Sequence, residues 1–326
     1  MKVKTSAVEH NGEQLQPRKK KSRLSALQSK KGKVLFLCAL PVIAYVIIFG
    51  YVPIWGLGYA FVEYRLGRPM MDSTFVGFNN FKILFENPVI RENVFQSVIN
   101  TLGMAALDYL LLPLPMMFAI LLSEIKCTPF KKVVQTVSTL PNFISWVIVY
   151  ALCNALFSYT GLFNTLFMER GWIDEPFNVL MTTDGVWVNM TILERWKGLG
   201  WSSIVYFSAI AGIDQEQYEA AAIDGAGRWA RIRHITIPNL MPTFVVLLIM
   251  GVGRILNTGF DQYYVFENAF NQEFLTTLDL YVYHLGIGSG MVSYGVATGL
   301  LKSVIALTLF FSANYIAKKV RGSGIA

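Results

Sequence analysis

The sequence predicts an all-α integral membrane protein with six transmembrane helices. Of its 326 residues, 54% are hydrophobic and only 15% are charged, a composition typical of membrane-embedded chains. Long apolar runs recur along the chain, and about 20 apolar residues suffice for a helix to cross the hydrocarbon layer of a lipid bilayer. We therefore expect one six-helix membrane domain over residues 33–326. Residues 1–32 are polar and strongly basic, and we expect them to form a disordered cytoplasmic tail.

The first two spans are separated by a polar segment. Val34–Val62 contains 29 uncharged residues, far more than the 7–15 of a signal-peptide core, and it is interpreted as the first span. A short amphipathic segment is predicted around Phe78–Phe85. The second apolar run, Asn93–Ser123, is longer than one crossing requires, and we expect Pro113 and Pro115 to kink it.

The remaining four spans follow in order, and the fourth is the least regular because three charged residues lie within it. Some of the third run must lie at the surface, since it also exceeds one crossing. The predicted ranges are Val133–Met168 for the third span, about Trp187 to Ile213 for the fourth, Leu240–Gln262 for the fifth and Met291–Ile316 for the sixth.

The distribution of basic residues orients the chain. Residues 1–33, the loops 123–132 and 214–241 and the segment after Ile316 together contain nineteen Lys and Arg residues. The segments 63–92, 159–190 and 262–290 contain five. By the positive-inside rule both termini and the loop 214–241 are predicted to be cytoplasmic.

The loop 214–241 has the pattern of two short helices with a glycine between them. Its alanines and glutamate favour a first helix, which Gly225 breaks. A second helix is expected from about Gly227, and three- and four-residue spacing places Trp229, Ile232 and Thr236 on one side of it. We expect Pro238 to end this helix.

This loop resembles the EAA signature of the permease subunits of bacterial ATP-binding-cassette importers. The positions of that pattern are occupied here by Glu219, Ala220, Ala221, Asp224, Gly225, Ala226, Ile235, Pro238 and Pro242. Ile232 replaces the usual aromatic residue and Ile237 the usual leucine, so both positions remain apolar. The resemblance implies a coupling helix that seats in a cleft of a cytoplasmic ATPase subunit. The coupling residues that it implies are Glu219, Ala220, Ala221, Asp224, Gly225, Ala226, Trp229, Ile232 and Pro238.

A wider resemblance, from about Lys33 to the C-terminus, is to the sugar permeases of the aldouronate and alginate type. It depends on the stretches Tyr51–Gly56, Val133–Thr136, Leu140–Trp146, Asn257–Gln262 and Gly299–Ser303. The resemblance implies the six-helix core of type I importers, which works by alternating access in the inner membrane. It further implies a homologous second permease, two ATPase subunits that bind Mg-ATP, an extracytoplasmic solute-binding protein and an oligosaccharide substrate. A uronate-rich, alginate-type oligosaccharide is the specific expectation.

The sequence offers no chemistry of its own for ATP hydrolysis, because the phosphate-binding pattern GxxxxGK[ST] does not occur. It also shows no nucleophile triad, no metal-ligand spacing and no nucleic-acid-binding motif, so we expect a chain that is not itself an enzyme and holds no cofactor. A secondary transporter or channel, or a membrane-embedded enzyme, would be the alternatives. Neither alternative explains the loop 214–241.

Polar residues inside spans are candidates for the substrate path, since charge at membrane depth is costly unless it faces protein or water. On a continuous fifth helix, Arg254, Asn257, Thr258 and Asp261 would form one polar stripe, followed by Gln262. On the sixth span, Tyr294, Thr298 and Lys302 share one face. The alternative is structural: the stripe packs against neighbouring helices, and Lys302 neutralises Asp108. Aromatic residues near span ends, including Trp187 and Tyr264, are predicted to be interfacial anchors.

Overall fold

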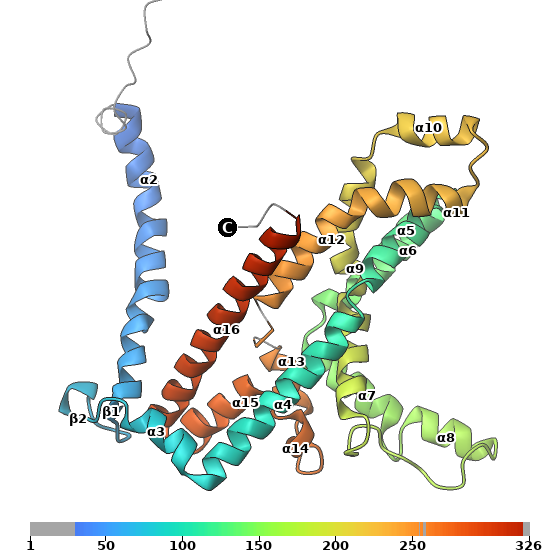
Figure 1. The fold of residues 1–326 in the computed structure, drawn as a ribbon. Coiled ribbons are helices and arrows are strands. Elements are labelled where there is room, and N and C mark those ends of the chain that lie inside the picture. Colours follow the sequence, from blue (N-terminus) through green and yellow to red (C-terminus); the bar gives the residue numbers. More distant parts are fainter. Residues whose placement is uncertain (1–29, 254, 257–258, 322–326) are drawn as a thin grey trace, which may run out of the picture. The chain divides into compact units, whose positions relative to one another are not determined.

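The structure is a computed structural model that describes residues 30–253, 255–256 and 259–321. The described residues are predominantly helical, which confirms the all-α class (Figure 1). The chain divides into two compact units, one ending at Gly56 and one beginning at Leu57. Five helical stretches are long and apolar enough to cross a membrane by length and composition: Lys33–Phe61, Pro88–Ser123, Trp146–Glu169, Arg228–Val252 and Val292–Ser312.

The first predicted span is helical throughout. It begins as α2 (Lys30–Val46) and continues through the π-helix η1 (Ile47–Tyr51) into the 3-10 helix η2 (Val52–Phe61). Large apolar side chains are exposed along its length, with Leu35 at 71% and Phe49 at 65% exposure. A helix that is apolar on all sides is expected to face lipid or another chain.

A small hairpin and an amphipathic helix open the second unit. Asn80 is buried, and its amide donates to the carbonyls of Ala60 at 2.9 Å and Val62 at 3.0 Å. This contact ties the helix to the end of η2. The elements are β1 (Val62–Glu63), η3 (Met70–Asp72), β2 (Thr74–Phe75), which pairs antiparallel with β1, and α3 (Asn79–Glu86), which confirms the predicted amphipathic segment.

The second span is divided at the predicted proline kink. Asn87 caps α4 (Pro88–Leu110), because its side chain accepts from the N–H groups of Val89 and Ile90. A turn precedes α5 (Leu114–Ser123), whose first residues contain the second proline of the pair.

The third apolar run forms four segments rather than one helix: α6 (Thr128–Thr139), η4 (Leu140–Phe143), α7 (Trp146–Phe157) and α8 (Leu162–Glu169). Pro141 in η4 and the Ser145 side chain, which caps α7, explain the first break. The run is therefore longer than one crossing because it contains three separate α-helices.

The fourth predicted span is α9 (Val186–Ala211), which packs against α4, α5, α6 and α12. It packs so closely on α6 that a Cβ atom on Gly200 would lie 2.3 Å from the backbone of Ser138. Two of its charged side chains contact protein: Arg195 pairs with Asp108, and Lys197 Nζ donates to the Asn142 carbonyl at 2.9 Å. These contacts explain how a helix with several charges can lie inside the bundle.

The loop after α9 leads into a continuous helical rod. α10 (Gln215–Ile223) is followed by α11 (Arg228–Arg231), the π-helix η5 (Ile232–Thr236) and α12 (Ile237–Val252). The prediction that Pro238 ends the second helix is therefore wrong. Pro238 occupies the first turn of α12, and the wider π-turn before it accommodates a residue without an N–H group.

The fifth span differs most from its prediction, because α12 ends at Val252 and a new helix, α13, begins at Phe260. Glycines at 251, 253 and 259 lie at this interruption, and glycine destabilises a helix interior. The sixth span is one long helix, as predicted. The C-terminal elements are α13 (Phe260–Phe266), α14 (Gln272–Leu275), α15 (Leu278–Tyr283), the π-helix η6 (His284–Gly288) and α16 (Val292–Arg321).

Two hydrophobic clusters hold the second unit together. One joins α4, α7 and α9 to α13–α15 through side chains such as Met104, Val149 and Phe266. The other joins α5, α9 and α12 to the start of η5 through Ile120, Tyr206 and other residues. The second cluster contains Ile232 and Leu240, so it packs the end of the loop after α9 against α5 and α9.

Candidate functional site

The loop between α9 and α12 contains the predicted two helices joined at a glycine (Figure 1). Asp214 caps α10, because its carboxylate accepts from the Glu216 N–H at 3.0 Å. Gly225 has a φ of +78°, a left-handed conformation that glycine adopts without steric cost. The Ala226 N–H then closes the turn on the Ala221 carbonyl at 2.8 Å.

Side-chain contacts attach α10 to the rod that becomes a membrane span. The hydroxyl groups of Tyr218 and Thr236 share a hydrogen bond of 2.9 Å. The Asn239 amide donates to the Gln217 side-chain oxygen at 3.2 Å. These two hydrogen bonds therefore attach α10 to η5 and α12.

The structure separates residues that were expected to share one side of the second helix. Ile232 is 6% exposed and packs in the cluster with Tyr206, and Thr236 is 2% exposed. Trp229 is instead 71% exposed. The spacing rule of a regular α-helix fails here because the backbone changes to a π-helix at Ile232. Ile232 is thus part of the hydrophobic core and does not present its side chain at the surface.

One exposed residue of the loop was missed in the sequence. Ile223, the last residue of α10, is 87% exposed, which is unusual for a large apolar side chain. The sequence signal that could have identified Ile223 was its position between an alanine-rich helix and the Asp-Gly turn. Glu219, Ala220, Asp224, Gly225 and Pro238 are also exposed, whereas Ala221 and Ala226 are half-buried.

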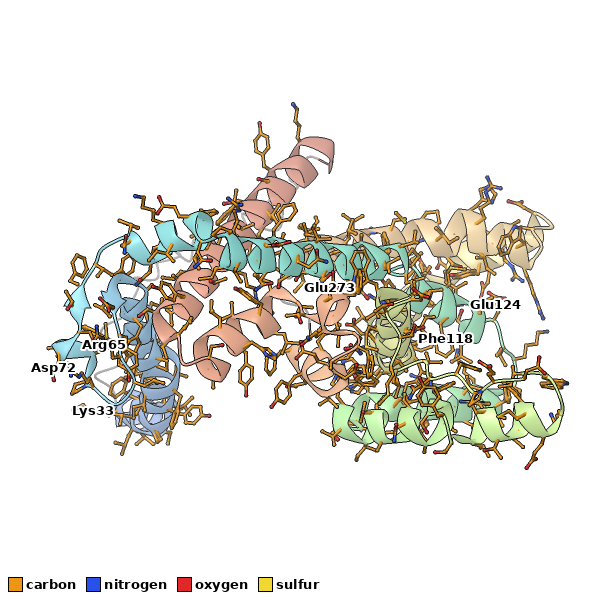
Figure 2. The ribbon with its side chains drawn as sticks, turned by 90° about the horizontal axis from the view of Figure 1, so that it is seen from below. Lys33, Arg65, Asp72, Phe118, Glu124 and Glu273 are labelled. Atoms are coloured by element: carbon orange, nitrogen blue, oxygen red, sulfur yellow. The ribbon has the colours of Figure 1, made fainter. Side chains whose placement is uncertain are left out.

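A cavity of about 420 Å³ lies beside this loop. Glu124, which follows α5, lies next to the α11–α12 rod (Figure 2). Lys131 of α6 and Arg231 of α11 contribute positive charge, and Tyr218 lines the cavity from α10. The cavity leaves space between the loop and the connection from α5 to α6.

The predicted substrate-path residues do not lie together in the structure that is described. Arg254, Asn257 and Thr258 lie outside the described residues. Asp261 is exposed on α13, which is a separate helix from α12, so the proposed stripe on one continuous helix is wrong. Gln262 is 1% exposed, and its amide donates to the Met190 carbonyl at 2.8 Å, a contact between α13 and α9.

Lys302 and Asp108 both form ion pairs, but with partners that were not predicted. Lys302 on α16 pairs with Asp279 on α15, and its side chain is 9% exposed. Asp108 on α4 pairs with Arg195 on α9. The predicted pairing of Lys302 with Asp108 is therefore wrong. Tyr294 is half-buried and packs with Ala60 and Leu84 in a small apolar cluster.

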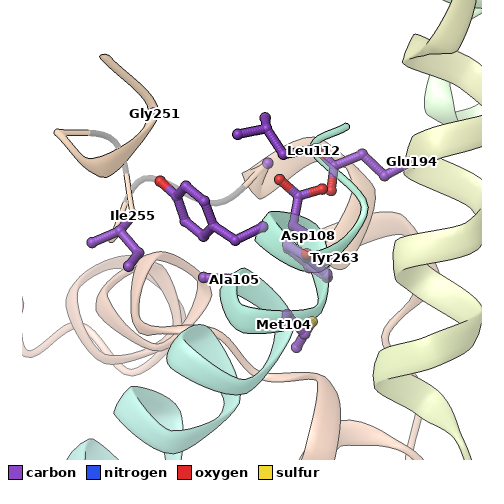
Figure 3. A pocket seen from close by; sticks show the side chains of 10 residues that line it. Met104, Ala105, Asp108, Leu112, Glu194, Gly251, Ile255 and Tyr263 are labelled. Carbon is purple, nitrogen blue, oxygen red and sulfur yellow. The ribbon is translucent and has the colours of Figure 1, made fainter. Parts of the chain in front are cut away.

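A second cavity, of about 250 Å³, lies among α4, α9, α12 and α13 at the interruption of the fifth span. The side chains of Asp108 and Glu194 approach one another there (Figure 3). Tyr263 contributes from α13, and Gly251 and Gly259 border the interruption. Among the lining residues that the structure describes, the charged groups are these two carboxylates. The cavity can therefore accept hydrogen bonds from hydroxyl groups.

Comparison with known proteins agrees with this architecture. Protein LplB of Bacillus subtilis (strain 168) is 40% identical over 91% of this chain and 92% of its own length. The polygalacturonan/rhamnogalacturonan transport system permease protein YteP of the same organism is 37% identical over 94% of this chain and 95% of its own. A chain in the crystal structure of a bacterial ABC transporter involved in the import of the acidic polysaccharide alginate is also similar. It superposes with a TM-score of 0.80 at 30% identity, covering 91% of this chain and 99% of the solved one.

Residues 111–322 match the family described as binding-protein-dependent transport system inner membrane component. This match includes the loop after α9, the interrupted fifth span and α16. The chain therefore belongs to the family of inner membrane components of binding-protein-dependent transport systems, the permease subunits of ABC importers.

Proposed function

We propose that this chain is the permease subunit of an ATP-driven importer of oligosaccharides that contain uronate units. The supporting observation is that two proteins similar over more than nine-tenths of this chain are named for acidic polysaccharides, alginate in one case and polygalacturonan in the other. The secondary transporter or channel considered above does not fit the family. It would also leave the loop after α9 without a purpose.

The importer would contain a homologous second permease, two ATPase subunits and an extracytoplasmic solute-binding protein. A solved alginate transporter with a TM-score of 0.81 to this chain was crystallised with its oligosaccharide-bound periplasmic protein, which supports the last of these. Mg-ATP would be held by the ATPase subunits. The chain would lie in the inner membrane with both termini cytoplasmic, because basic residues concentrate in those segments.

Coupling to ATP hydrolysis would run through α10 and the Gly225 turn. Ile223 and Trp229 are the exposed apolar side chains there, and burial of such side chains in a cleft of the ATPase would stabilise the complex. The buried Ile232 and the Tyr218–Thr236 hydrogen bond would then pass movement to α12. Such a connection would let ATP hydrolysis in the motor subunit move a membrane span.

The substrate path would pass the cavity that contains Asp108 and Glu194. Its carboxylates are acceptors, so they would bind sugar hydroxyls and repel sugar carboxylates at close range. Lys302 is paired with Asp279 and is not free for a substrate. A cation for the uronate carboxylate would therefore come from Arg254 or from the second permease.

The test is reconstitution of the complete complex with its binding protein in proteoliposomes. Uptake and stimulated ATP hydrolysis are compared for oligogalacturonates and for carboxyl-reduced oligosaccharides of the same length. We expect the acidic series to be imported and the reduced series to stimulate hydrolysis less. Preferential import of the reduced series would refute the acidic substrate while leaving the role as an importer permease intact.

A further inference from the structure

Four aromatic rings gather on α13 and at the junction of α15 and η6, outside the cavity described above. Phe260 and Tyr264 are stacked, with ring centroids 5.4 Å apart and planes 16° from parallel. Tyr283 meets both rings edge-on at 5.3 Å, and the His284 ring lies 5.8 Å from Tyr283. We refer to these four rings as the aromatic platform.

The platform is exposed at Tyr264 and His284, whereas Phe260 and Tyr283 are half-buried against the cluster that contains Phe266. Tyr264 is 48% exposed, and a side-chain hydrogen bond to Tyr264 raises the pKa of Tyr283. Beside it, the half-buried Glu267 uses both carboxylate oxygens: Oε1 accepts from the Thr276 hydroxyl at 2.6 Å, and Oε2 lies 2.8 Å from His284 Nε2.

The Glu267 carboxylate determines which ring nitrogen of His284 is available to a ligand. Because Glu267 can only accept, Nε2 carries the hydrogen, and Nδ1 is the ring nitrogen left for a ligand. The described residues provide no hydrogen-bond partner for Nδ1. In the neutral ring Nδ1 accepts from a hydroxyl group, and in the protonated ring it donates to a carboxylate.

The platform adjoins the Asp108–Glu194 cavity along one helix. Gly259 and Tyr263 line the cavity, and the residues that follow each of them, Phe260 and Tyr264, belong to the platform. The segment 262–290, which contains most of the platform, is also the segment predicted to be extracytoplasmic. The platform and the Tyr263 side of the cavity therefore both belong to the side of the membrane on which a binding protein would deliver a ligand.

We infer that the aromatic platform is an entry subsite for the oligosaccharide, on which a pyranose ring stacks while His284 Nδ1 engages its hydroxyl or carboxylate. Aromatic faces with a few precisely placed polar groups are typical of small-molecule sites. A lipid-facing surface has no use for a carboxylate–imidazole pair, which would be costly in hydrocarbon. This subsite rests on the proposed function, because its ligand is the imported sugar.

The experiment uses the complete reconstituted importer with saturating loaded binding protein. Tyr264→Phe keeps the ring, whereas Tyr264→Leu keeps apolar bulk without it. We expect Tyr264→Phe to import at nearly the wild-type rate and Tyr264→Leu to import roughly three- to tenfold more slowly. Tyr159→Leu is the control, since Tyr159 is a 53% exposed tyrosine away from the platform.

Equal import by Tyr264→Leu and Tyr264→Phe would overturn the subsite. If Tyr264→Leu fails to assemble, the wild-type complex is tested instead with a diazirine-labelled oligosaccharide and peptide mass spectrometry. Labelling of the peptides that contain Tyr264 and Tyr283 supports the subsite, and labelling confined to other peptides overturns it. Failure of the proposed function has a different signature, because the wild-type complex would then import the carboxyl-reduced oligosaccharide in preference to the acidic one.

Discussion

Replacing Gly225 by alanine would perturb the turn between α10 and α11 without touching any neighbouring side chain. A Cβ atom at this position meets nothing within 4 Å, so the whole effect comes from the φ of +78°. A left-handed conformation costs a non-glycine residue roughly 1–2 kcal/mol, which corresponds to roughly a five- to thirtyfold loss in the population of the native turn. Gly227 provides a matched control, because a Cβ there also meets open space while its φ is an ordinary −67°.

The assay is sugar imported per ATP hydrolysed in proteoliposomes, with assembly checked by co-purification of the ATPase. We expect Gly225→Ala to assemble, since the turn lies outside the buried clusters, but to lose coupled import about five- to thirtyfold. Gly227→Ala should remain within about twofold of wild type, because surface changes of this kind are worth no more than about 0.5 kcal/mol. Equal behaviour of the two variants would refute the argument that the left-handed turn presents the coupling helix.

Three further predictions concern other parts of the chain. Ile223→Ala should weaken ATPase binding by about 1.5–3 kcal/mol if this side chain is buried on docking, as measured by pull-down titration. Ile287→Ala is the control, because Ile287 is similarly exposed but lies outside the loop, and it should have no effect. Equal losses of binding in the two variants would contradict the docking role of Ile223. Lys302→Met should lower the free energy of unfolding of the purified complex by about 3–5 kcal/mol, because it leaves Asp279 partly buried and unpaired. Lys302→Met combined with Asp279→Leu should recover most of that loss. No recovery would mean that loss of the ion pair is not the cause. Arg254→Ala should slow import of an acidic oligosaccharide with little loss of assembly, and normal uptake in membrane vesicles would remove its proposed role in the substrate path.

Several features of the fold follow from local chemistry and were predicted from the sequence. The proline pair after α4 produced the expected break, because a proline cannot continue the backbone hydrogen bonding of a helix. Gly225 produced the expected turn for the corresponding reason, its freedom to adopt positive φ. The loop with its two helices was recognisable because these signals lie within a short segment.

The composition of the candidate site was less predictable. Arg195, Asp108 and Lys302 could each be identified as charged residues within predicted spans, but Asp279 lies in a segment predicted to be outside them. The actual pairs join α4 to α9 and α15 to α16. The aromatic platform was also hidden, because Tyr264 was predicted to be an interfacial anchor and its neighbours in the platform were not expected to form a site with it. Residues far apart in sequence become neighbours only when the helices pack.

The sequence by itself determined that this chain is a helical membrane protein, where most of its long apolar helices lie and where the two-helix loop after α9 lies, since run length, charge and glycine or proline content act locally. The tertiary structure decided that Ile232 faces inward while Ile223 and Trp229 face outward, and that the fifth span is interrupted beside a cavity. Burial and pairing depend on what lies across from a side chain in space. Helix packing, which the linear pattern does not contain, therefore decides them.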